Sequence, residues 1–480
     1  MSRLPVALLG ISFASLKTEE LVNAILKLAE DYRKDLMPRH VSWVDTTSIP
    51  QIYSSDFTSI LYPELLHTLR QSDEIGTSSR ALIWLSYALG APIPFNTKKA
   101  LFYKLVEQIE ARKLSIFLVG ENESSIKTIS SFLQRHVPQL NIAGTSHGPI
   151  YVKGENLENA KERDALLLEQ INRSVPDFLF IHLSSPKPEL WFNRVRKQLH
   201  VPITIDMEEN LEYSGFSKQN SKHWILNFFK LLFLAIPLLF FHHLNALMYR
   251  LTQSNRSIVK PPNPLLFISS TQAVALVQLP PLYDRQFCEE LSISWEDLFS
   301  QDALILDFQH VRHLDSYAVS HLMKTIMRAN REKKPFYIMG ISGDIRLLLR
   351  LHRIWDMLRN FDCHSPDGVI ARLNCESEPS SLYDSIQQDH GQVVIHFFGD
   401  LDLNQNYDSY LTKLAPVIYQ KECLLDLTYC HYIDNSAFVF LLKLRENRQT
   451  QFRSLKLRNL TPSLKRQFDL VHASALFTIE

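Results

Sequence analysis

An internal repeat in the second half of the chain constrains the fold more than any other feature of the sequence. The stretch LILDFQHVRHLDSYAVSHLMK, at residues 304–324, aligns without a gap with CLLDLTYCHYIDNSAFVFLLK, at residues 423–443. Asp307 aligns with Asp426 and Asp315 aligns with Asp434, both at an offset of 119 residues. A repeat at a fixed offset indicates that one small fold is used twice.

Each copy contains the same series of apolar runs and amphipathic stretches. We expect a strand, a helix, a buried strand that ends in aspartate, a second helix, a further strand and a final helix. Asp315 and Asp434 stand directly before the second helix, where a carboxylate accepts hydrogen bonds from otherwise unpaired backbone N–H groups. The pattern predicts two small α/β domains, at residues 265–378 and 379–480.

The most apolar part of the chain is HWILNFFKLLFLAIPLLFFHHLNALMYR, at residues 223–250. Its unbroken apolar run is shorter than the ~20 residues that a spanning helix needs, and Pro237 would kink or end a helix. Aromatic residues flank the run, as is typical of a water–lipid boundary. Residues 223–252 are predicted to form an amphipathic, membrane-facing appendage of one or two helices. A buried helical hairpin, an oligomer interface and a true span are the alternatives. The polar, Pro-rich residues 253–264 are predicted to be a linker.

Residues 1–222 alternate short apolar runs with amphipathic stretches, beginning with a strand expected at Val6–Ile11. This alternation predicts βαβ units and one parallel sheet covered by helices on both faces, which is a three-layer α/β domain. Ligands of such sheets bind at the carboxyl ends of the strands. The turns expected at that edge are Gly120–Asn122, Gly144–Gly148, Ser184–Glu189 and Asp206–Gly215.

Six motifs follow one another in this half: LLGISF, KTEELV, LIWLSYALG, SIFLVGENESSI, GTSHG and SSPKPELW. In this order they resemble the WecG/TagA/CpsF glycosyltransferases, family 26, over roughly residues 5–250. The most specific match is Pro186-Lys187-x-Glu189-x-Trp191 after an apolar strand. The resemblance implies transfer of a sugar from a nucleotide-sugar to a polyprenyl-diphosphate-linked acceptor in bacterial envelope polysaccharide synthesis. It also implies a cytoplasmic protein held peripherally at the inner membrane face, with no cofactor besides the nucleotide-sugar donor.

The same resemblance implies a set of site residues. The candidate polar catalytic groups are Asp45 and Glu74. The residues implied around the donor are Gly120, His147, Lys187 and Glu189. Lys187 and Glu189 are expected either to pair with each other and orient their loop or to contact the donor.

Two departures from the family pattern lie at the predicted nucleotide site. The family's Thr-x-Asn turn corresponds to Trp43-Val44-Asp45, and its Gly-x-Gly-Gly-x-Phe-Asp loop corresponds to residues 205–211, which contain no glycine. Glycines in such a loop let backbone N–H groups approach a diphosphate, whereas larger side chains block that approach. We therefore expect a catalytically degenerate crevice that is crowded by Trp43 and Met207.

The replaced loop is also acidic. Each carboxylate of Asp206, Glu208 and Glu209 would repel a dianion at about 4–5 Å by on the order of a few kcal/mol. The loop is expected to be solvated. The alternative is a divalent metal ion held by these three residues and Glu212.

The repeated unit of the second half resembles the STAS domain of anti-sigma factor antagonists and sulfate-transporter tails, because Asp-Ser or Asp-Asn follows an Asp-ending strand in both copies. The resemblance implies a protein partner bound through these domains. The serine that bacterial antagonists phosphorylate corresponds to Tyr317 in the first copy and Ser436 in the second. Ser436 is the candidate regulatory phosphosite, because a helix N-terminus favours a phosphate, although Asp434 opposes it. A capping or packing role for Ser436 is the alternative.

The charge balance limits the range of partners. Lys and Arg number 51, as do Asp and Glu, so the formal net charge is zero and no broad basic field would attract nucleic acid. The cysteines show no zinc-type spacing, and no metal site is predicted. The sequence therefore predicts a membrane-associated glycosyltransferase of this type with degenerate catalytic motifs. The alternative is a non-enzymatic scaffold or regulatory protein that acts through its two STAS-like domains.

Overall fold

A computed structural model describes most of the chain. The described residues are 4–45, 48–53, 60–152, 157–207, 221–253, 265–268, 273–292, 298–332, 334–358, 386–389, 392–398, 401, 407, 410–412, 414, 422–430, 433–449, 455–460, 462–471 and 473–480.

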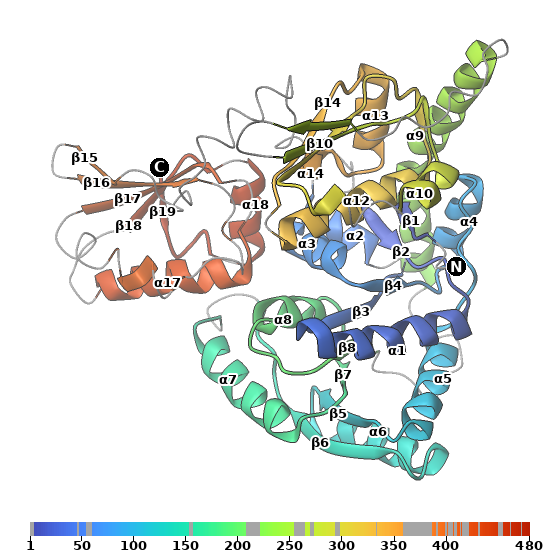
Figure 1. Cartoon of the computed structure of the whole chain (residues 1–480). Coiled ribbons are helices and arrows are strands. Elements are labelled where there is room, and N and C mark those ends of the chain that lie inside the picture. The colour runs from blue at the N-terminus through green and yellow to red at the C-terminus, as the bar shows by residue number, and fades with distance from the viewer. Residues whose placement is uncertain are drawn as a thin grey trace.

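The first half is built on a parallel sheet of six strands in the order β4-β3-β8-β7-β5-β6 (Figure 1). The strands are β3 (Arg39–Trp43), β4 (Glu74–Gly76), β5 (Ser115–Gly120), β6 (Asn141–His147), β7 (Phe178–His182) and β8 (Ile203–Met207). Every neighbouring pair is parallel. The four strands β3, β5, β7 and β8 are buried throughout, because helices cover both faces.

Two hydrophobic cores lie on opposite faces of this sheet. The helices on one face are α1 (Thr18–Asp35), α5 (Lys98–Ala111) and α6 (Glu123–His136), which pack on Ile116, Phe178 and Ile203. The helices on the other face are α2 (Ile49–Ile52), α3 (Pro63–Gln71), α4 (Arg80–Ala88), α7 (Leu157–Ser174) and α8 (Lys187–Val195). Alternate strand residues, such as Phe117, Leu179 and Ile181, face this second core. The predicted three-layer α/β fold is confirmed.

The first apolar run does not join the main sheet. It forms a hairpin of β1 (Val6–Leu8) and β2 (Ile11–Phe13), so the expectation of one strand over Val6–Ile11 is wrong. Leu9 and Gly10 both have positive φ angles in the turn. Gly10 is required for a second reason, because a Cβ atom there would lie 2.8 Å from the carbonyl oxygen of Arg353 in the second half. The hairpin therefore joins the two halves of the chain.

The apolar segment forms one helix, α9 (Ser221–Gln253), and Pro237 does not end it. This helix packs against α2, α4 and α13 (Gly343–Leu351), and Leu231, Ala235 and Leu238 belong to the first-half core. By length and composition alone, α9 is the helix within the described ranges that is long and apolar enough to cross a membrane. Its window Leu231–Leu251 is 24% buried, so the alternative of a hairpin enclosed in a soluble core is wrong. Of the predicted linker 253–264, Gln253 is described, as the last residue of α9.

The second half contains two smaller sheets of similar order. The first sheet is β14-β12-β10-β9 and the second is β15-β16-β17-β18-β19. Their strands are β9 (Leu265–Ile268), β10 (Ala273–Gln278), β12 (Ala303–Asp307), β14 (Phe336–Met339), β15 (Ile386–Asp389), β16 (Gln392–Phe398), β17 (Glu422–Tyr429), β18 (Leu455–Arg458) and β19 (Thr478–Ile479). Along the chain, the first strand of each sheet (β9 or β15) is antiparallel to the second (β10 or β16). The strands that follow pair in parallel. A separate short pair joins β11 (Leu282–Tyr283) to β13 (His313–Leu314).

The helices of the second half follow the repeat as well. Those with described bounds are α10 (Arg285–Ser292), α12 (Ser316–Arg331), α13, α14 (Trp355–Leu358), α17 (Asn435–Gln449) and α18 (Pro462–Leu470). The predicted N-caps are confirmed, because Asp315 accepts a hydrogen bond from the Ala318 N–H at 2.8 Å and Asp434 accepts one from the Ala437 N–H at 2.9 Å. Because α12 is buried against its own domain and against β1 and β2, the first repeat is fixed to the first half.

Candidate functional site

The carboxyl ends of the six parallel strands meet at one edge of the main sheet, where ligands of such sheets bind. In sheet order, the last residues at this edge are Gly76, Trp43, Met207, His182, Gly120 and His147. The register places Gly120 opposite His147 on one side and opposite His182 on the other. The edge therefore collects residues that are far apart in the sequence.

Three of the four predicted donor residues lie at this edge. Gly120 ends β5, His147 ends β6 with an exposed side chain, and Lys187 begins α8 after the loop that follows β7. A Cβ atom at Gly120 would lie 2.7 Å from Cδ1 of Ile126, so the glycine lets α6 begin close against the strand. Helix packing therefore accounts for Gly120 without any ligand.

Lys187 pairs with Glu121 and not with Glu189. The Lys187 Nζ atom lies 2.7 Å from Oε1 of Glu121, in the turn after β5. Residues two positions apart on a helix do not face each other, and Lys187 and Glu189 both lie in the first turn of α8. The predicted ion pair between Lys187 and Glu189 is therefore wrong. The pair that forms joins two turns across the carboxyl edge.

Glu189 points into the protein beneath this edge. The residue is 2% exposed, and its Oε1 atom accepts a hydrogen bond of 2.7 Å from the Ser185 hydroxyl. No described residue forms a hydrogen bond with its Oε2 atom. Burial, together with the negative charge of Asp206, raises the pKa of Glu189 to about 7. A carboxyl group with this pKa can gain or lose a proton near neutral pH, as general acids and bases do.

A histidine that the sequence analysis missed lies in the same buried cluster. The His40 Nε2 atom lies 3.0 Å from Oδ1 of Asp206, and Oδ2 of the same carboxylate accepts a hydrogen bond of 2.9 Å from the Ser42 hydroxyl. Burial opposes a charged imidazole, but the carboxylates of Asp206 and Glu189 outweigh it and raise the pKa of His40 above its ordinary value. The sequence signal for this cluster was the placement of His40 and Ser42 on one face of a strand.

The position of Asp206 corrects one expectation. Asp206 is 6% exposed within β8 and is hydrogen-bonded, so it does not belong to a solvated acidic loop. Glu208, Glu209 and Glu212 lie outside the described residues. Within the part of the chain that the structure describes, no group of three or more His, Cys, Asp or Glu side chains is placed to hold a metal ion.

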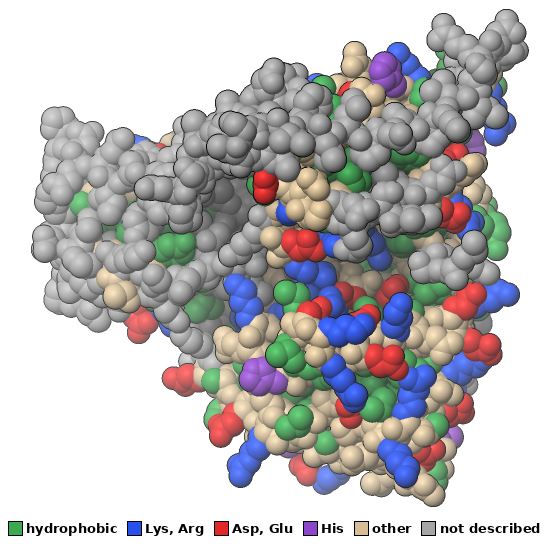
Figure 2. Space-filling view, viewed as in Figure 1, with side chains coloured by type: hydrophobic (Ala, Val, Ile, Leu, Met, Phe, Trp, Pro, Cys, Tyr) green, Lys and Arg blue, Asp and Glu red, His purple; other side chains and the backbone are tan. Residues whose placement is uncertain are grey.

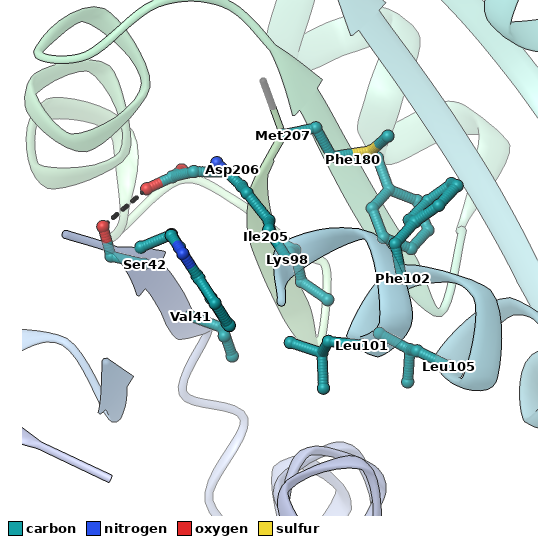
Figure 3. A pocket seen from close by; sticks show the side chains of 11 residues that line it. Val41, Ser42, Lys98, Leu101, Phe102, Leu105, Phe180, Ile205, Asp206 and Met207 are labelled. Atoms are coloured by element: carbon teal, nitrogen blue, oxygen red, sulfur yellow. Dashed lines mark hydrogen bonds between the residues drawn. The ribbon is translucent and has the colours of Figure 1, made fainter. Parts of the chain in front are cut away.

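Bulky side chains line the crevice between β3 and β8 (Figure 3). The cavity there has a volume of about 20 Å³, which is enough for about one water molecule. Trp43 and Met207 line it and are 8% and 3% exposed. A Cβ atom at Gly76 would lie 2.2 Å from the Trp43 ring, so a glycine on β4 makes room for the indole. The described side chains therefore leave no space for a sugar nucleotide at this point.

The two candidate catalytic carboxylates do not lie together. Asp45 follows β3 at the carboxyl edge, where its Oδ1 atom accepts a hydrogen bond of 3.2 Å from the Ser48 N–H. Glu74 begins β4, and its surroundings include Lys324 of α12. Burial raises the pKa of Glu74, although the charge of Lys324 opposes the shift. Asp45 is thus the candidate that lies at the carboxyl edge of the sheet.

The two phosphosite positions of the repeat differ in their surroundings. Tyr317 is 6% exposed, belongs to the core of the first half, and lies with its ring 5.4 Å from the Arg285 guanidinium. Ser436 is in the first turn of α17, and its side chain lies outside the described residues. The burial of Tyr317 removes that position from the solvent.

Three comparisons with known proteins found similarities to parts of this chain. Residues 6–225 match the sequence profile of the glycosyl transferase WecG/TagA/CpsF family. The N-acetylglucosaminyldiphosphoundecaprenol N-acetyl-beta-D-mannosaminyltransferase of Bacillus subtilis (strain 168) is 25% identical over 125 residues, which are 26% of this chain and 44% of that enzyme. The chain therefore spans less than half the length of that relative. Among solved structures, the unphosphorylated anti-sigma factor antagonist SpoIIAA matches 24% of this chain and 100% of its own, with a TM-score of 0.21 and 13% identity.

By its fold, the first half is a three-layer α/β domain whose candidate site lies at the carboxyl edge of the sheet. Residues 6–225 are similar to the glycosyl transferases of the WecG/TagA/CpsF family.

Proposed function

We propose that this chain is a membrane-associated glycosyltransferase of the WecG/TagA/CpsF type in bacterial envelope polysaccharide synthesis, with a crevice too narrow for efficient transfer. Its donor class is a nucleotide-linked N-acetylhexosamine and its acceptor is a polyprenyl-diphosphate-linked sugar, in line with the name of its Bacillus subtilis relative. Gly120, His147, Lys187 and Glu189 border the donor position in this proposal. The observation that carries it is the filling of the β3–β8 crevice by Trp43 and Met207 within a domain of this family.

The physical argument for weak transfer is steric and electrostatic. A transferase must hold the diphosphate of its donor against backbone N–H groups or cationic side chains. At the predicted position the described chain instead presents an indole packed on Gly76 and a buried carboxylate, Asp206. Lys187, in the turn after β7, is paired with Glu121 at 2.7 Å, and Lys98 at the start of α5 is the cation that lines the crevice. Donor binding would have to displace each of these interactions.

Opening the crevice is expected to restore donor binding. The variant with Trp43→Thr and Asp45→Asn returns the turn to the Thr-x-Asn pattern and removes the indole from the cavity. At 1 mM UDP-N-acetylmannosamine the parent chain is expected to show no shift in melting temperature. An opened variant with a Kd of about 0.1 mM would gain roughly 1.4 kcal/mol, which is measurable by differential scanning fluorimetry.

Trp84→Thr is the matched control, because it removes a half-exposed indole on α4 instead of the crevice indole. It is expected to leave the response to the donor unchanged. Loss of Trp43 packing should lower the unliganded stability by about 3 kcal/mol or more, so the shift is measured against each variant's own melting temperature. A parent chain that binds the donor at micromolar concentration and transfers the sugar would refute the narrow crevice.

The membrane part of the proposal rests on the two faces of α9. Leu231, Ala235, Leu238 and His242 are buried at helical spacing. The apolar residues on the exposed side include Phe233, Ile236, Phe240, Leu247 and Leu251, which are 53–66% exposed. A contiguous exposed apolar stripe of this length is typical of a surface that meets lipid or another protein. In this proposal α9 lies along the membrane face, next to the donor domain.

Polar substitutions on the exposed stripe are expected to release the protein from lipid. Phe240→Ser with Leu247→Ser removes two apolar side chains that would each contribute about 1.5–3 kcal/mol on burial in lipid. Flotation with phosphatidylglycerol–phosphatidylethanolamine vesicles is expected to fall by at least tenfold. Leu166→Ser, at a 59% exposed position on α7, is the control and should float like the parent. Equal flotation of the parent and the double variant would contradict lipid contact.

The alternative function is a scaffold or regulatory protein that acts through the repeated domains, which we propose to be STAS-like. One contact favours it: α12 is buried against the first-half hairpin, and the Ser12 and Ser320 hydroxyl groups are hydrogen-bonded across this contact. The first repeat therefore packs directly against the glycosyltransferase-like domain, in addition to its covalent connection through the chain. An opened crevice that still fails to bind any nucleotide-sugar would favour the scaffold.

A further inference from the structure

A large cavity lies at the opposite edge of the main sheet from the proposed donor site. Its volume is about 780 Å³, within the range of about 300–1,000 Å³ that is common for small-molecule sites. Pro38 and His200, which precede β3 and β8, line it, together with the last turns of α1 and α3. It is therefore at the amino-terminal edge of the strands.

Three parts of the chain meet around this cavity. The first half supplies α1, α3 and the segment after α8, the first repeat supplies the end of α12, and the second repeat supplies Asp434 at the start of α17. Figure 1 shows α3, α8, α12 and α17 converging on this region. Contacts of α17 with α7 and α8 hold the second repeat here. A ligand in this cavity would touch all three parts.

The wall of the cavity carries an excess of positive charge. Arg196 and Lys197 follow α8, and Arg331 ends α12. In the view of Figure 2, Lys and Arg side chains lie in the middle of the molecule, interspersed with Asp and Glu side chains. Among the described lining residues, Asp434 is the one carboxylate; it is buried, and its Oδ1 atom caps α17. The lining residues thus present three cations and one carboxylate.

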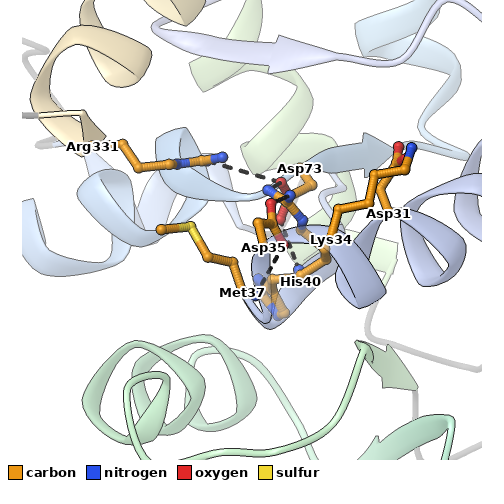
Figure 4. A network of polar contacts seen from close by, with 8 residues as sticks. Asp31, Lys34, Asp35, Met37, His40, Asp73 and Arg331 are labelled. Carbon is orange, nitrogen blue, oxygen red and sulfur yellow. Dashed lines mark hydrogen bonds and ion pairs between the residues drawn. The ribbon is translucent and has the colours of Figure 1, made fainter.

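Asp73, a carboxylate close to these cations, already interacts with two arginines. Asp73 lies 3.5 Å from Arg39 and 3.9 Å from Arg331, and it also accepts a hydrogen bond from the His40 N–H at 2.9 Å (Figure 4). Arg39 is also bonded to Asp35. The acidic groups behind the wall are therefore used by Arg39 and Arg331 and leave Arg196 unneutralised.

Arg196 is the group that indicates a ligand. Its guanidinium forms no hydrogen bond or ion pair with any described residue and lies 5.7 Å from the centre of the Phe192 ring. Partial burial, with Arg331 and Arg39 close by, lowers the pKa of Arg196 below its usual value, although Asp73 opposes the shift. Cations held close together in this way are stabilised when an anion enters.

We propose that this cavity is a second, non-catalytic site that binds a nucleoside phosphate. Its phosphates lie against Arg196, Lys197 and Arg331, because guanidinium groups bind phosphate oxygens in pairs. Its base and ribose lie against the apolar side chains of Met37, Leu199 and Met327, which share the wall. The bound nucleotide contacts the glycosyltransferase-like domain and both repeats. Its binding therefore stabilises the arrangement of the repeats against that domain.

Binding of ADP to the full chain, measured by isothermal titration calorimetry, tests the proposal. ADP is expected to bind at sub-millimolar concentration and more tightly than either pyrophosphate or adenosine. Arg196→Gln is expected to weaken ADP roughly tenfold or more, because a charge-assisted phosphate contact contributes about 1.5–3 kcal/mol. Lys197→Gln, at an exposed position where folding is not at risk, is expected to weaken ADP by a smaller factor in the same direction.

Two control variants separate this site from the rest of the surface. Lys187→Gln removes a cation at the donor edge, and Lys27→Gln removes an exposed lysine in the middle of α1. Both should bind ADP like the parent. The site is refuted if the parent binds no ADP at 1 mM, if pyrophosphate binds as tightly as ADP, or if Lys187→Gln weakens ADP as much as Arg196→Gln does. Because the donor site is at the other edge, failure here leaves the proposed glycosyltransferase function standing.

Discussion

Replacing Arg194 with leucine is expected to lower the free energy of unfolding of the first half by about 3–5 kcal/mol. Arg194 in α8 donates to Asp164 in α7 through Nε at 2.6 Å and Nη2 at 3.2 Å, and its Nη1 donates to the Tyr151 carbonyl oxygen at 2.9 Å. Both side chains are at most 10% exposed. Without the guanidinium, the Asp164 carboxylate remains buried with one donor among these contacts, the Trp191 indole N–H at 3.0 Å.

Urea denaturation followed by circular dichroism measures this loss, and two comparison variants define its cause. The double variant Arg194→Leu with Asp164→Leu is expected to recover most of the stability, because a buried pair replaced by apolar groups is often neutral. Lys187→Leu breaks an ion pair that is about one-third exposed at Lys187, so it should cost at most about 1 kcal/mol. Equal losses for the single and the double variant would show that packing, and not charge, fixes α7 to α8.

The buried Arg194–Asp164 pair also helps to position the side chains at the carboxyl edge of the sheet. Arg194 lies near the end of α8, whose first turn carries Lys187 and Glu189. Because a helix moves as a rigid unit, fixing its last turn to α7 also fixes the positions of those two side chains at its start. The stability of α8 and the geometry of the candidate site are therefore linked through one ion pair.

The parts of the fold that the sequence predicted depend on local patterns. Buried parallel strands are short apolar runs, so the parallel sheet and its carboxyl edge were predictable from their alternation with helices, whereas the short edge strand β4 was not. The caps at Asp315 and Asp434 were predictable because an N-cap is defined by its position directly before a helix. Gly120, His147 and Lys187 were placed at one edge for the same reason.

The parts that the sequence did not predict depend on contacts between distant residues. The hydrogen bond between His40 and Asp206 joins strands that are 166 residues apart, and no local pattern pairs them. The same contact withdraws Asp206 from solvent, which a count of charges in the loop does not reveal. The β1–β2 hairpin leaves the main sheet because α12, more than 300 residues away, covers it; the Ser12–Ser320 contact spans 308 residues.

Three buried histidines are expected to make the contact between α9 and the first repeat sensitive to acid. His242 in α9 lies with its ring 5.2 Å from that of His313 in β13 and 6.4 Å from that of His352, which follows α13. Burial lowers the pKa of His242 to about 4, that of His313 to about 4 and that of His352 to about 3. The neighbouring cations, including Arg250 near His313, act in the same direction.

The sign of the pH dependence follows from these lowered pKa values. The folded protein holds fewer protons on these rings than the unfolded chain, whose histidines titrate near 6.5. Their contribution to stability is therefore complete above pH 6.5 and is lost as the pH falls toward 4. At pH 5 each of the three rings lowers the free energy of unfolding by about 2 kcal/mol relative to its value above pH 6.5. The sum of about 6 kcal/mol is comparable with the whole stability of many domains.

The variant His352→Leu is expected to be more stable than the parent, and increasingly so as the pH falls. His352 is fully buried, and neither of its ring nitrogens forms a hydrogen bond with a described residue. Leucine therefore removes a desolvation penalty of about 1–3 kcal/mol at pH 7. At pH 5 the advantage should grow by about 2 kcal/mol, because one proton-linked penalty is removed. Urea denaturation at pH 5, 6 and 7 measures the difference, and His200→Leu, at an exposed position, is the control that should show no growth. A His352→Leu advantage that stays constant between pH 7 and pH 5 would mean that this histidine has the same pKa in the folded and the unfolded chain, and that the contact between α9 and the first repeat tolerates its charge.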